Sequence, residues 1–213
     1  NLRSFPLMTN FFGLPYIDAR LSFNSFIPAS LNDEVAERLA NHYLQTLSKQ
    51  PYLHDKIEFE IVHSCYTFDL DEKLSLLREG AFCLADTDEI SSALLSLTNN
   101  IIHPDRGLWK KDAQKLAILT ERRQQLYAST LSLPGKIYWL LEDAKRYGTL
   151  PFAGLARAGF VAVQMLQSLV QMGVFSKNEY HLFLESICTI NKKMSLHMVL
   201  QGQVKLLLHS TTH

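Results

Sequence analysis

From residue 71 to the end of the chain, apolar residues recur at helical spacing in one segment after another, and this pattern constrains the fold most. The longest example is the segment 152–170, where large apolar residues form a stripe and Arg157, Gln164 and Ser168 lie on the opposite side. Apolar residues three or four positions apart share one face of a helix. The pattern therefore predicts a helical region over residues 71–213, with an amphipathic helix over 152–170.

Residues that begin and end helices subdivide this region. Pro134 stands where the first turn of a helix tolerates proline, and Gly148 and Gly173 are expected to end helices as C-terminal caps. Ser176 and Glu179 have the spacing of a capping box, which predicts a further helix start. These signals predict three consecutive helices, separated near residues 148 and 173.

The first seventy residues are organised differently. Apolar and polar residues alternate over Tyr16–Ile27, and a second alternation covers residues 57–61. A period of two predicts β-strands, whereas the segment 30–47 between them has the spacing of a helix. The predicted fold class is therefore mostly α, of the α+β kind: a helical domain with a small β element near the N-terminus. We expect an α+β part over residues 1–70 and a helical part over 71–213, together forming one compact domain.

The charge balance and the cysteine content limit the possible partners and the compartment. Lys and Arg number 21, as do Asp and Glu, and a neutral chain lacks the charge that draws proteins to nucleic acid or to anionic membranes. No apolar run approaches the roughly 20 residues of a membrane helix. The three cysteines and the lack of a secretory leader are typical of a reducing compartment. We therefore expect a cytoplasmic protein with no nucleic-acid and no membrane partner.

The sequence predicts neither a metal site nor a nucleotide site. His63 and Cys65 stand two positions apart, but Cys83 and Cys188 are distant, whereas structural zinc needs ligand pairs at short spacing on both sides of a loop. The nine glycines form no phosphate-binding loop. We therefore expect this segment to bind no metal and no cofactor, and the catalytic residues are unknown.

Three polar side chains form the first candidate binding site. On the strand predicted over Tyr16–Ile27, Asp18, Arg20 and Asn24 project from the face opposite the apolar one. Arginine grips a carboxylate or phosphate with two parallel hydrogen bonds, so the three side chains could converge on an anionic ligand. The alternative is an Asp–Arg pair on the solvent face of a half-exposed strand.

Two further places are candidates for binding an anion or a partner. The loop 103–107 holds a base, an acid and a guanidinium, with His103 and Arg106 as its candidate binding residues, although a polar turn between two helices has the same composition. Arg157 stands alone among small residues near a helix start, where it could meet an anion or a partner surface. Alternatively, the small residues permit close helix packing, and Arg157 lies at the polar edge of the helix.

Three stretches of the sequence, Phe12–Pro28, His54–Ile61 and Leu133–Phe160, resemble the central region of large phosphoenolpyruvate synthase-like proteins. These proteins belong to the pyruvate phosphate dikinase family of phosphoenolpyruvate-utilising enzymes, and the resemblance spans most of the chain. In that family an ATP-grasp domain phosphorylates a histidine of a mobile domain, which passes the phosphate to a small carbonyl substrate or another acceptor. Neither an ATP-grasp pattern nor the Thr-Gly-Gly-rich phosphohistidine segment is recognisable in this sequence.

The resemblance implies a non-catalytic central or scaffolding domain of a phosphoenolpyruvate synthase-like phosphotransferase. Its partners would be the other domains of its own parent chain, and ATP and magnesium would be bound elsewhere in that kinase-like transferase. The missing initiator methionine leads us to expect a domain fragment of a larger protein. Two other hypotheses remain open: a free-standing helical protein-interaction module that takes a partner peptide between its helices, and a small enzyme with an unrecognised anionic-substrate site.

Overall fold

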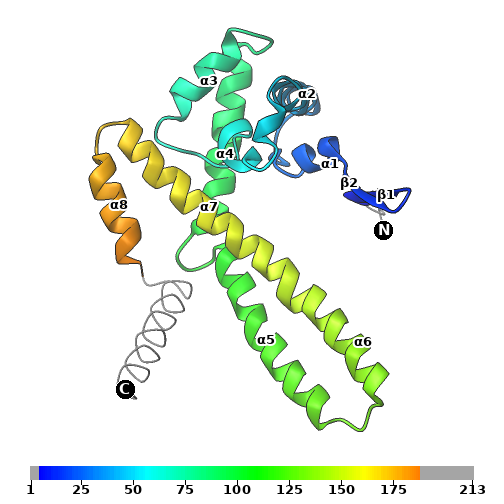
Figure 1. The fold of residues 1–213 in the computed structure, drawn as a ribbon. Helices are drawn as coiled ribbons and strands as arrows, with labels where there is room; N and C mark the ends of the chain where they lie inside the picture. Colours follow the sequence, from blue (N-terminus) through cyan, green and yellow to red (C-terminus); the bar gives the residue numbers. More distant parts are fainter. Residues whose placement is uncertain (1–4, 188–213) are drawn as a thin grey trace, which may run out of the picture. The chain divides into compact units, whose positions relative to one another are not determined.

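The computed structural model describes residues 5–187, and the chain divides into two compact units, Asn1–Ser168 and Leu169–His213. Over the described residues, the first unit is helical apart from one β-hairpin near the N-terminus (Figure 1). The predicted fold class, mostly α with a small β element near the N-terminus, is therefore confirmed. The elements in chain order are β1 (Met8–Phe11), β2 (Leu14–Ile17), α1 (Ala19–Asn24), α2 (Asp33–Lys49), η1 (Pro51–Leu53), η2 (Ile57–Ile61), α3 (Leu70–Arg78), α4 (Leu84–Ile102), α5 (Leu108–Ala128), α6 (Leu133–Asp143), η3 (Ala144–Thr149), α7 (Leu150–Gln171) and α8 (Lys177–Ser186).

The N-terminal hairpin pairs β1 with β2 in antiparallel register, with Met8 opposite Ile17. Phe12 and Gly13 form its two-residue turn, and both have a positive φ, 53° and 85°. Such turns match the right-handed twist of hairpin strands, and glycine adopts a left-handed backbone without strain. Most side chains of both strands are exposed, so the hairpin adds little to the core.

The strand predicted over Tyr16–Ile27 is wrong beyond β2, because the chain turns into helix α1. Asp18 begins this helix: its Oδ1 accepts a hydrogen bond from the backbone N–H of Leu21 at 3.0 Å. Phe23 is completely buried in the core, where its ring centroid lies 5.8 Å from that of Tyr43. A capping side chain and one buried aromatic ring therefore outweigh the alternating pattern.

The second predicted strand, residues 57–61, is also wrong, because these residues form the single helical turn η2. The backbone N–H of Val62 donates to the carbonyl of Ile57 at 3.0 Å, which closes a wide turn of π type. Ile61 faces the core, while the carbonyl of Glu58 is bound by a side chain of α7. Five residues are too few for a period of two to be distinguished from one helical turn.

The core of the first unit lies between α1, α2, α3 and α4. Apolar side chains from these four helices pack into one cluster together with side chains from residues 61–62 and 82. The most deeply buried members of this cluster are Phe23, Leu39, Tyr43, Leu70, Leu74, Ile90 and Leu94. Each large side chain removed from water contributes roughly 1.5–3 kcal/mol, so this cluster is the main source of stability for the unit.

Helix α5 runs antiparallel to the long helix that follows it. Pro134 lies in the first turn of α6, as predicted, but Gly148 does not end a helix: the chain passes through the π-type turn η3 into α7. The Nε of Arg122 on α5 lies 2.8 Å from the Oδ1 of Asp143 on α6, which joins the two helices. We call α5, α6 and η3, residues 108–149, the helical arm.

The helix runs without a break from Leu133 to Gln171. Much of its surface is exposed, although it contains a long apolar stretch. An 18-residue stretch of this helix is apolar, with at most two charged residues, and 17% of that stretch is buried. By length and composition alone this helix could cross a membrane, which corrects the expectation that no apolar run reaches that length. Core helices of soluble proteins have the same length and composition, so these two features assign no membrane partner.

Over its described residues, the second unit consists of the end of α7, a turn and α8. Gly173 ends α7 with a φ of 72°, as predicted. Ser176 and Glu179 form the predicted capping box: the Oγ of Ser176 accepts from the backbone N–H of Glu179 at 3.2 Å, and the carboxylate accepts from the N–H of Ser176 at 2.8 Å. Cys188 and the rest of the chain after it lie outside the described residues.

Candidate functional site

Helix α7 turns a partly polar face towards the rest of the first unit. Val161 and Ser168 are each 1% exposed, whereas Phe152, in the apolar stripe of the same helix, is 69% exposed. Arg157 and Gln164 are half-buried and share the inward face, because residues three or four positions apart lie on one side of a helix. An apolar stripe normally faces the core, but here much of it faces outwards.

The inward polar side chains of α7 bind the backbone of η2 and of the loop that follows it. The Nε2 of Gln164 donates to the carbonyl oxygen of Glu58 at 2.7 Å and to the Oγ of Ser64 at 2.9 Å. The Oγ of Ser168 accepts a hydrogen bond from the backbone N–H of Phe68 at 3.2 Å. Buried backbone groups need partners, so these side chains hold an irregular segment in place where no regular hydrogen-bond ladder exists.

Replacing Gln164 with leucine is expected to destabilise the chain by about 1–3 kcal/mol, because the Glu58 carbonyl and the Ser64 hydroxyl then lose their donor. Urea unfolding followed by circular dichroism measures this change. Gln167→Leu, at an exposed position of the same helix, is the matched control and is expected to change the stability by less than about 0.5 kcal/mol. Equal stability of the two variants would contradict a clamping role for Gln164.

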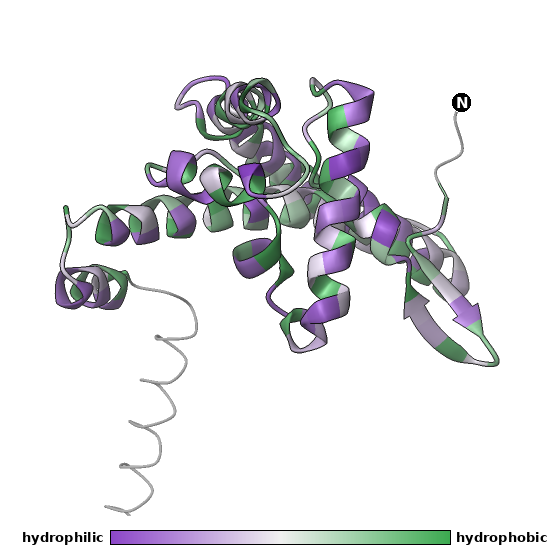
Figure 2. Cartoon of the chain, turned by 90° about the horizontal axis from the view of Figure 1, so that it is seen from above, coloured by the Kyte–Doolittle hydropathy of each residue, from purple (hydrophilic) through white to green (hydrophobic). Residues whose placement is uncertain are grey.

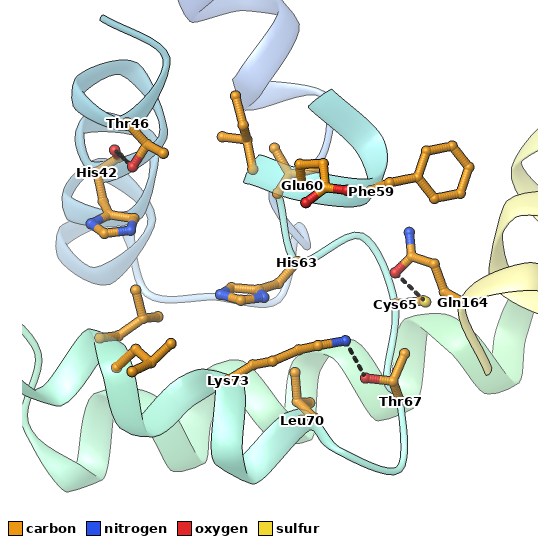
Figure 3. A pocket seen from close by; sticks show the side chains of 14 residues that line it. His42, Thr46, Phe59, Glu60, His63, Cys65, Thr67, Leu70, Lys73 and Gln164 are labelled. Atoms are coloured by element: carbon orange, nitrogen blue, oxygen red, sulfur yellow. Dashed lines mark hydrogen bonds between the residues drawn. The ribbon is translucent and has the colours of Figure 1, made fainter. Parts of the chain in front are cut away.

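A cavity of about 320 Å³ lies beside this loop, between α2, η2, α3 and α7 (Figure 3). His42 and Thr46 line it from α2, and Lys73 lines it from α3. His63 projects from the loop after η2, and Gln164 of α7 lies at another side of the cavity. Four elements that are distant in sequence therefore bring polar side chains to one cavity.

His63 is the residue of this cavity whose ionisation is most strongly perturbed. Its backbone N–H donates to the phenolic oxygen of Tyr43 at 3.1 Å, and the two rings meet edge to face with centroids 6.2 Å apart. Within residues 5–187, neither ring nitrogen of His63 has a hydrogen-bond partner. Burial, with smaller contributions from the charges of Lys73 and His42, lowers the pKa of His63 to about 4. The imidazole is therefore neutral at pH 7.

The cavity does not hold an activated nucleophile. Cys65 is buried, and its thiol donates to the Oε1 of Gln164 at 3.5 Å. Burial raises the pKa of the Cys65 thiol to about 11, so the reactive thiolate form is scarce at neutral pH. Lys73 is paired with Asp69, its Nζ lying 3.0 Å from Oδ1. No three His, Cys, Asp or Glu side chains in the described part of the chain are placed to hold a metal ion.

The structure brings two of the three residues of the first candidate site together. Asp18 is the N-cap of α1, while Arg20 and Asn24, four positions apart on that helix, line an open groove of about 480 Å³. Two carboxylates, Asp33 and Glu37, line the same groove. An anion bound there would meet both carboxylates, which disfavours the binding of an anionic ligand.

The loop 103–107 forms a tight polar turn at the end of α4. The Nδ1 of His103 accepts hydrogen bonds from the backbone N–H groups of Asp105 and Arg106 at 3.1 and 3.4 Å. The side chain of Arg106 is exposed. The local hydrogen bonds of His103 account for the polar composition of the loop.

Arg157, the third candidate from the sequence, does not line the cavity, but its charge acts on a residue that does. Its Nε is buried without a hydrogen-bond partner, and burial lowers the pKa of its guanidinium. Its charge lowers the pKa of the Cys65 thiol, which lines the cavity. The sequence did not single out His42 or Lys73, since neither belongs to a motif, and the polar side of α7 was the only signal for Gln164.

Comparison with known proteins adds no assignment, since no protein family, no curated protein and no solved structure matches the chain.

Proposed function

We propose that the chain is a non-catalytic scaffolding domain of a phosphoenolpyruvate synthase-like phosphotransferase, and that its helical arm packs on other domains of its parent chain. The sequence resemblance supplies the class of protein. The observation that carries the proposal is the exposed apolar surface of the helical arm. ATP and magnesium would act in other domains of the same protein.

Large apolar side chains gather on the helical arm without being buried. No residue of α5 is buried, and hydrophobic residues alternate with hydrophilic ones along the helices (Figure 2). The large apolar side chains of the arm that are exposed are Leu108, Leu116, Ile118, Tyr127, Leu131, Leu133, Ile137, Tyr138, Trp139 and Leu141. Monomeric proteins rarely leave such a surface in water, so a partner surface is expected to cover it.

The charge of the arm favours an acidic partner surface. Residues 108–149 include eight Lys or Arg and four Asp or Glu, although the whole chain is neutral. Exposed basic residues around an apolar surface steer an oppositely charged partner and disfavour a basic one. The other domains of the parent chain should therefore present an acidic surface with an apolar centre to the arm.

The cavity chemistry supports a non-catalytic role for this segment. The thiol of Cys65 is held in its protonated form, and no carboxylate within residues 5–187 is hydrogen-bonded to the imidazole of His63 to orient it as a general base. A catalytic site normally joins a nucleophile, a base and an orienting group. The catalytic groups of the parent enzyme would therefore come from elsewhere in its chain.

Hydroxyl-radical footprinting of the native gene product tests the proposal. Tyr138 and Trp139, which are 58% and 39% exposed in this chain, are expected to be oxidised several-fold more slowly in the native protein than in the isolated 213-residue chain. Tyr52 of η1, which is 69% exposed and lies outside the arm, serves as the reference side chain. Equal oxidation of Tyr138 and Trp139 in the two proteins would contradict the packing role of the arm.

A variant pair separates packing from folding. Ile137→Ser with Leu141→Ser, one turn apart on α6, should return Trp139 oxidation in the native protein to the rate of the isolated chain, since both side chains are exposed and the core is untouched. Gln124→Ser, on the exposed surface of α5, is the control and should leave the protection unchanged. A free-standing interaction module would use the same surface, and the mass of the native protein distinguishes the two functions.

A further inference from the structure

The cavity beside η2 holds a pair of imidazoles that the scaffolding role does not use. The His42 ring meets Tyr43 and Phe82 edge to face, both at 6.2 Å between centroids, and the His63 ring meets Tyr43 in the same way. Within residues 5–187, the ring nitrogens of both histidines lack hydrogen-bond partners. Both half-buried rings line the cavity, so their nitrogens are available to hydrogen-bond a polar ligand there.

One positive charge beside this cavity, that of Arg157, has no ionic partner among the described residues. Lys73 is paired with Asp69, but Arg157 forms no ion pair within the described residues and keeps a buried, unpartnered Nε. Burial raises the pKa of the Cys65 thiol, whereas Lys73 and Arg157 lower it, each by more than Asp69 raises it. A half-buried cation without a counter-charge favours an anion nearby.

The remaining charged groups leave this balance in place. Glu60 of η2 lines the cavity, but it is exposed, so water and salt screen its charge. Lys49 of α2 lowers the pKa of His42 after the larger effect of burial, but Lys49 is exposed as well, so its charge is screened in the same way. Within the described residues, the half-buried charge near the cavity that these groups leave uncompensated is therefore that of Arg157.

We infer that this cavity binds a small oxyanion, the carboxylate or phosphate group of a small molecule, between Lys73 and the imidazoles of His42 and His63 (Figure 3). Its volume of about 320 Å³ suits a small molecule. A neutral imidazole donates one hydrogen bond, and a protonated imidazole donates two. The bound anion therefore favours uptake of a proton by His63, and binding strengthens as the pH falls towards 4.

Titration of the full 213-residue chain with inorganic phosphate, and separately with acetate, tests the inference. The histidine ring signals are followed by NMR at constant ionic strength and at several pH values. We expect saturable shifts of the His42 and His63 signals and a rise in the pKa of His63. The tighter of the two probes identifies the phosphate or the carboxylate as the preferred group. No saturable shift with either probe up to about 10 mM would overturn the inference.

Removing the charge of Lys73 locates the site. Lys73→Met is expected to weaken binding about 10-fold, as for the loss of one charge-assisted hydrogen bond. Because this change leaves Asp69 unpaired, Lys73→Met combined with Asp69→Asn is measured as well and should show the same loss in a chain of balanced charge. Lys56→Met, at an exposed position, should retain the affinity. Unchanged affinity in the double variant would overturn the assignment to this cavity.

Discussion

Replacing Phe23 with alanine is expected to destabilise the chain by about 3–5 kcal/mol. Phe23 is completely buried, and its ring packs on Tyr43 at the centre of the core. The substitution removes a large apolar side chain and leaves a cavity that the surrounding helices can close only in part. Urea unfolding, followed by circular dichroism and analysed for the midpoint and the slope, measures the loss.

An exposed phenylalanine in the same N-terminal region provides the control for this substitution. Phe5 is 80% exposed, so Phe5→Ala should change the stability by less than about 0.5 kcal/mol. The comparison also tests the structure of residues 19–24. Helix α1 places Phe23 in the core, so a loss of stability no larger than that of Phe5→Ala would contradict this placement.

Acidification is expected to remove about 3 kcal/mol of stability through His63 alone. The folded protein holds the pKa of His63 at about 4, whereas the value in the unfolded chain is near 6.5. Between these values the unfolded state binds a proton that the folded state does not, so stability rises with pH in this window. The contribution is fully present above pH 6.5 and is lost as the pH falls towards 4. Unfolding curves measured at several pH values between 4 and 6.5 give the dependence of the free energy of unfolding on pH.

The variant His63→Gln isolates this contribution. Its free energy of unfolding should depend less on pH between 6.5 and 4 than that of the original chain. The pKa of His42 is lowered by burial and, to a smaller extent, by Lys49. His42 therefore also makes the free energy of unfolding rise with pH, and this contribution remains in the variant. His54→Gln, at an exposed position, is the control and should keep the original slope. Identical slopes for all three proteins would contradict the burial of a neutral His63.

Local signals predicted most of the helices because their ends are chemically marked. Pro134, Gly173 and the pair Ser176 and Glu179 act on the backbone within one turn, so their effects can be recognised without knowing the tertiary structure. Gly148 failed as a cap because helix packing carries the chain through η3 instead. The alternation in Tyr16–Ile27 failed because the burial of Phe23 depends on a distant helix.

The cavity could not be predicted from the sequence, because residues far apart in the chain form it. Gln164 binds the carbonyl of Glu58, 106 positions away, and this contact holds the loop that carries His63. Lys73 lies in an ordinary amphipathic helix, and nothing in its spacing marks it as a cavity residue. The sequence analysis considered His63 and Cys65 only as a metal pattern, which it rejected, and nothing in their spacing indicated that both line a cavity with His42 and Lys73.

The mass of the endogenous protein, measured on the intact native gene product, tests whether the chain is one domain of a larger phosphotransferase. A scaffolding domain of a phosphotransferase requires a native mass several times the 24.3 kDa of this chain. The native protein should then also exchange phosphate between ATP and a small carbonyl acceptor such as pyruvate. A native mass close to 24.3 kDa would contradict the account and would favour a free-standing interaction module.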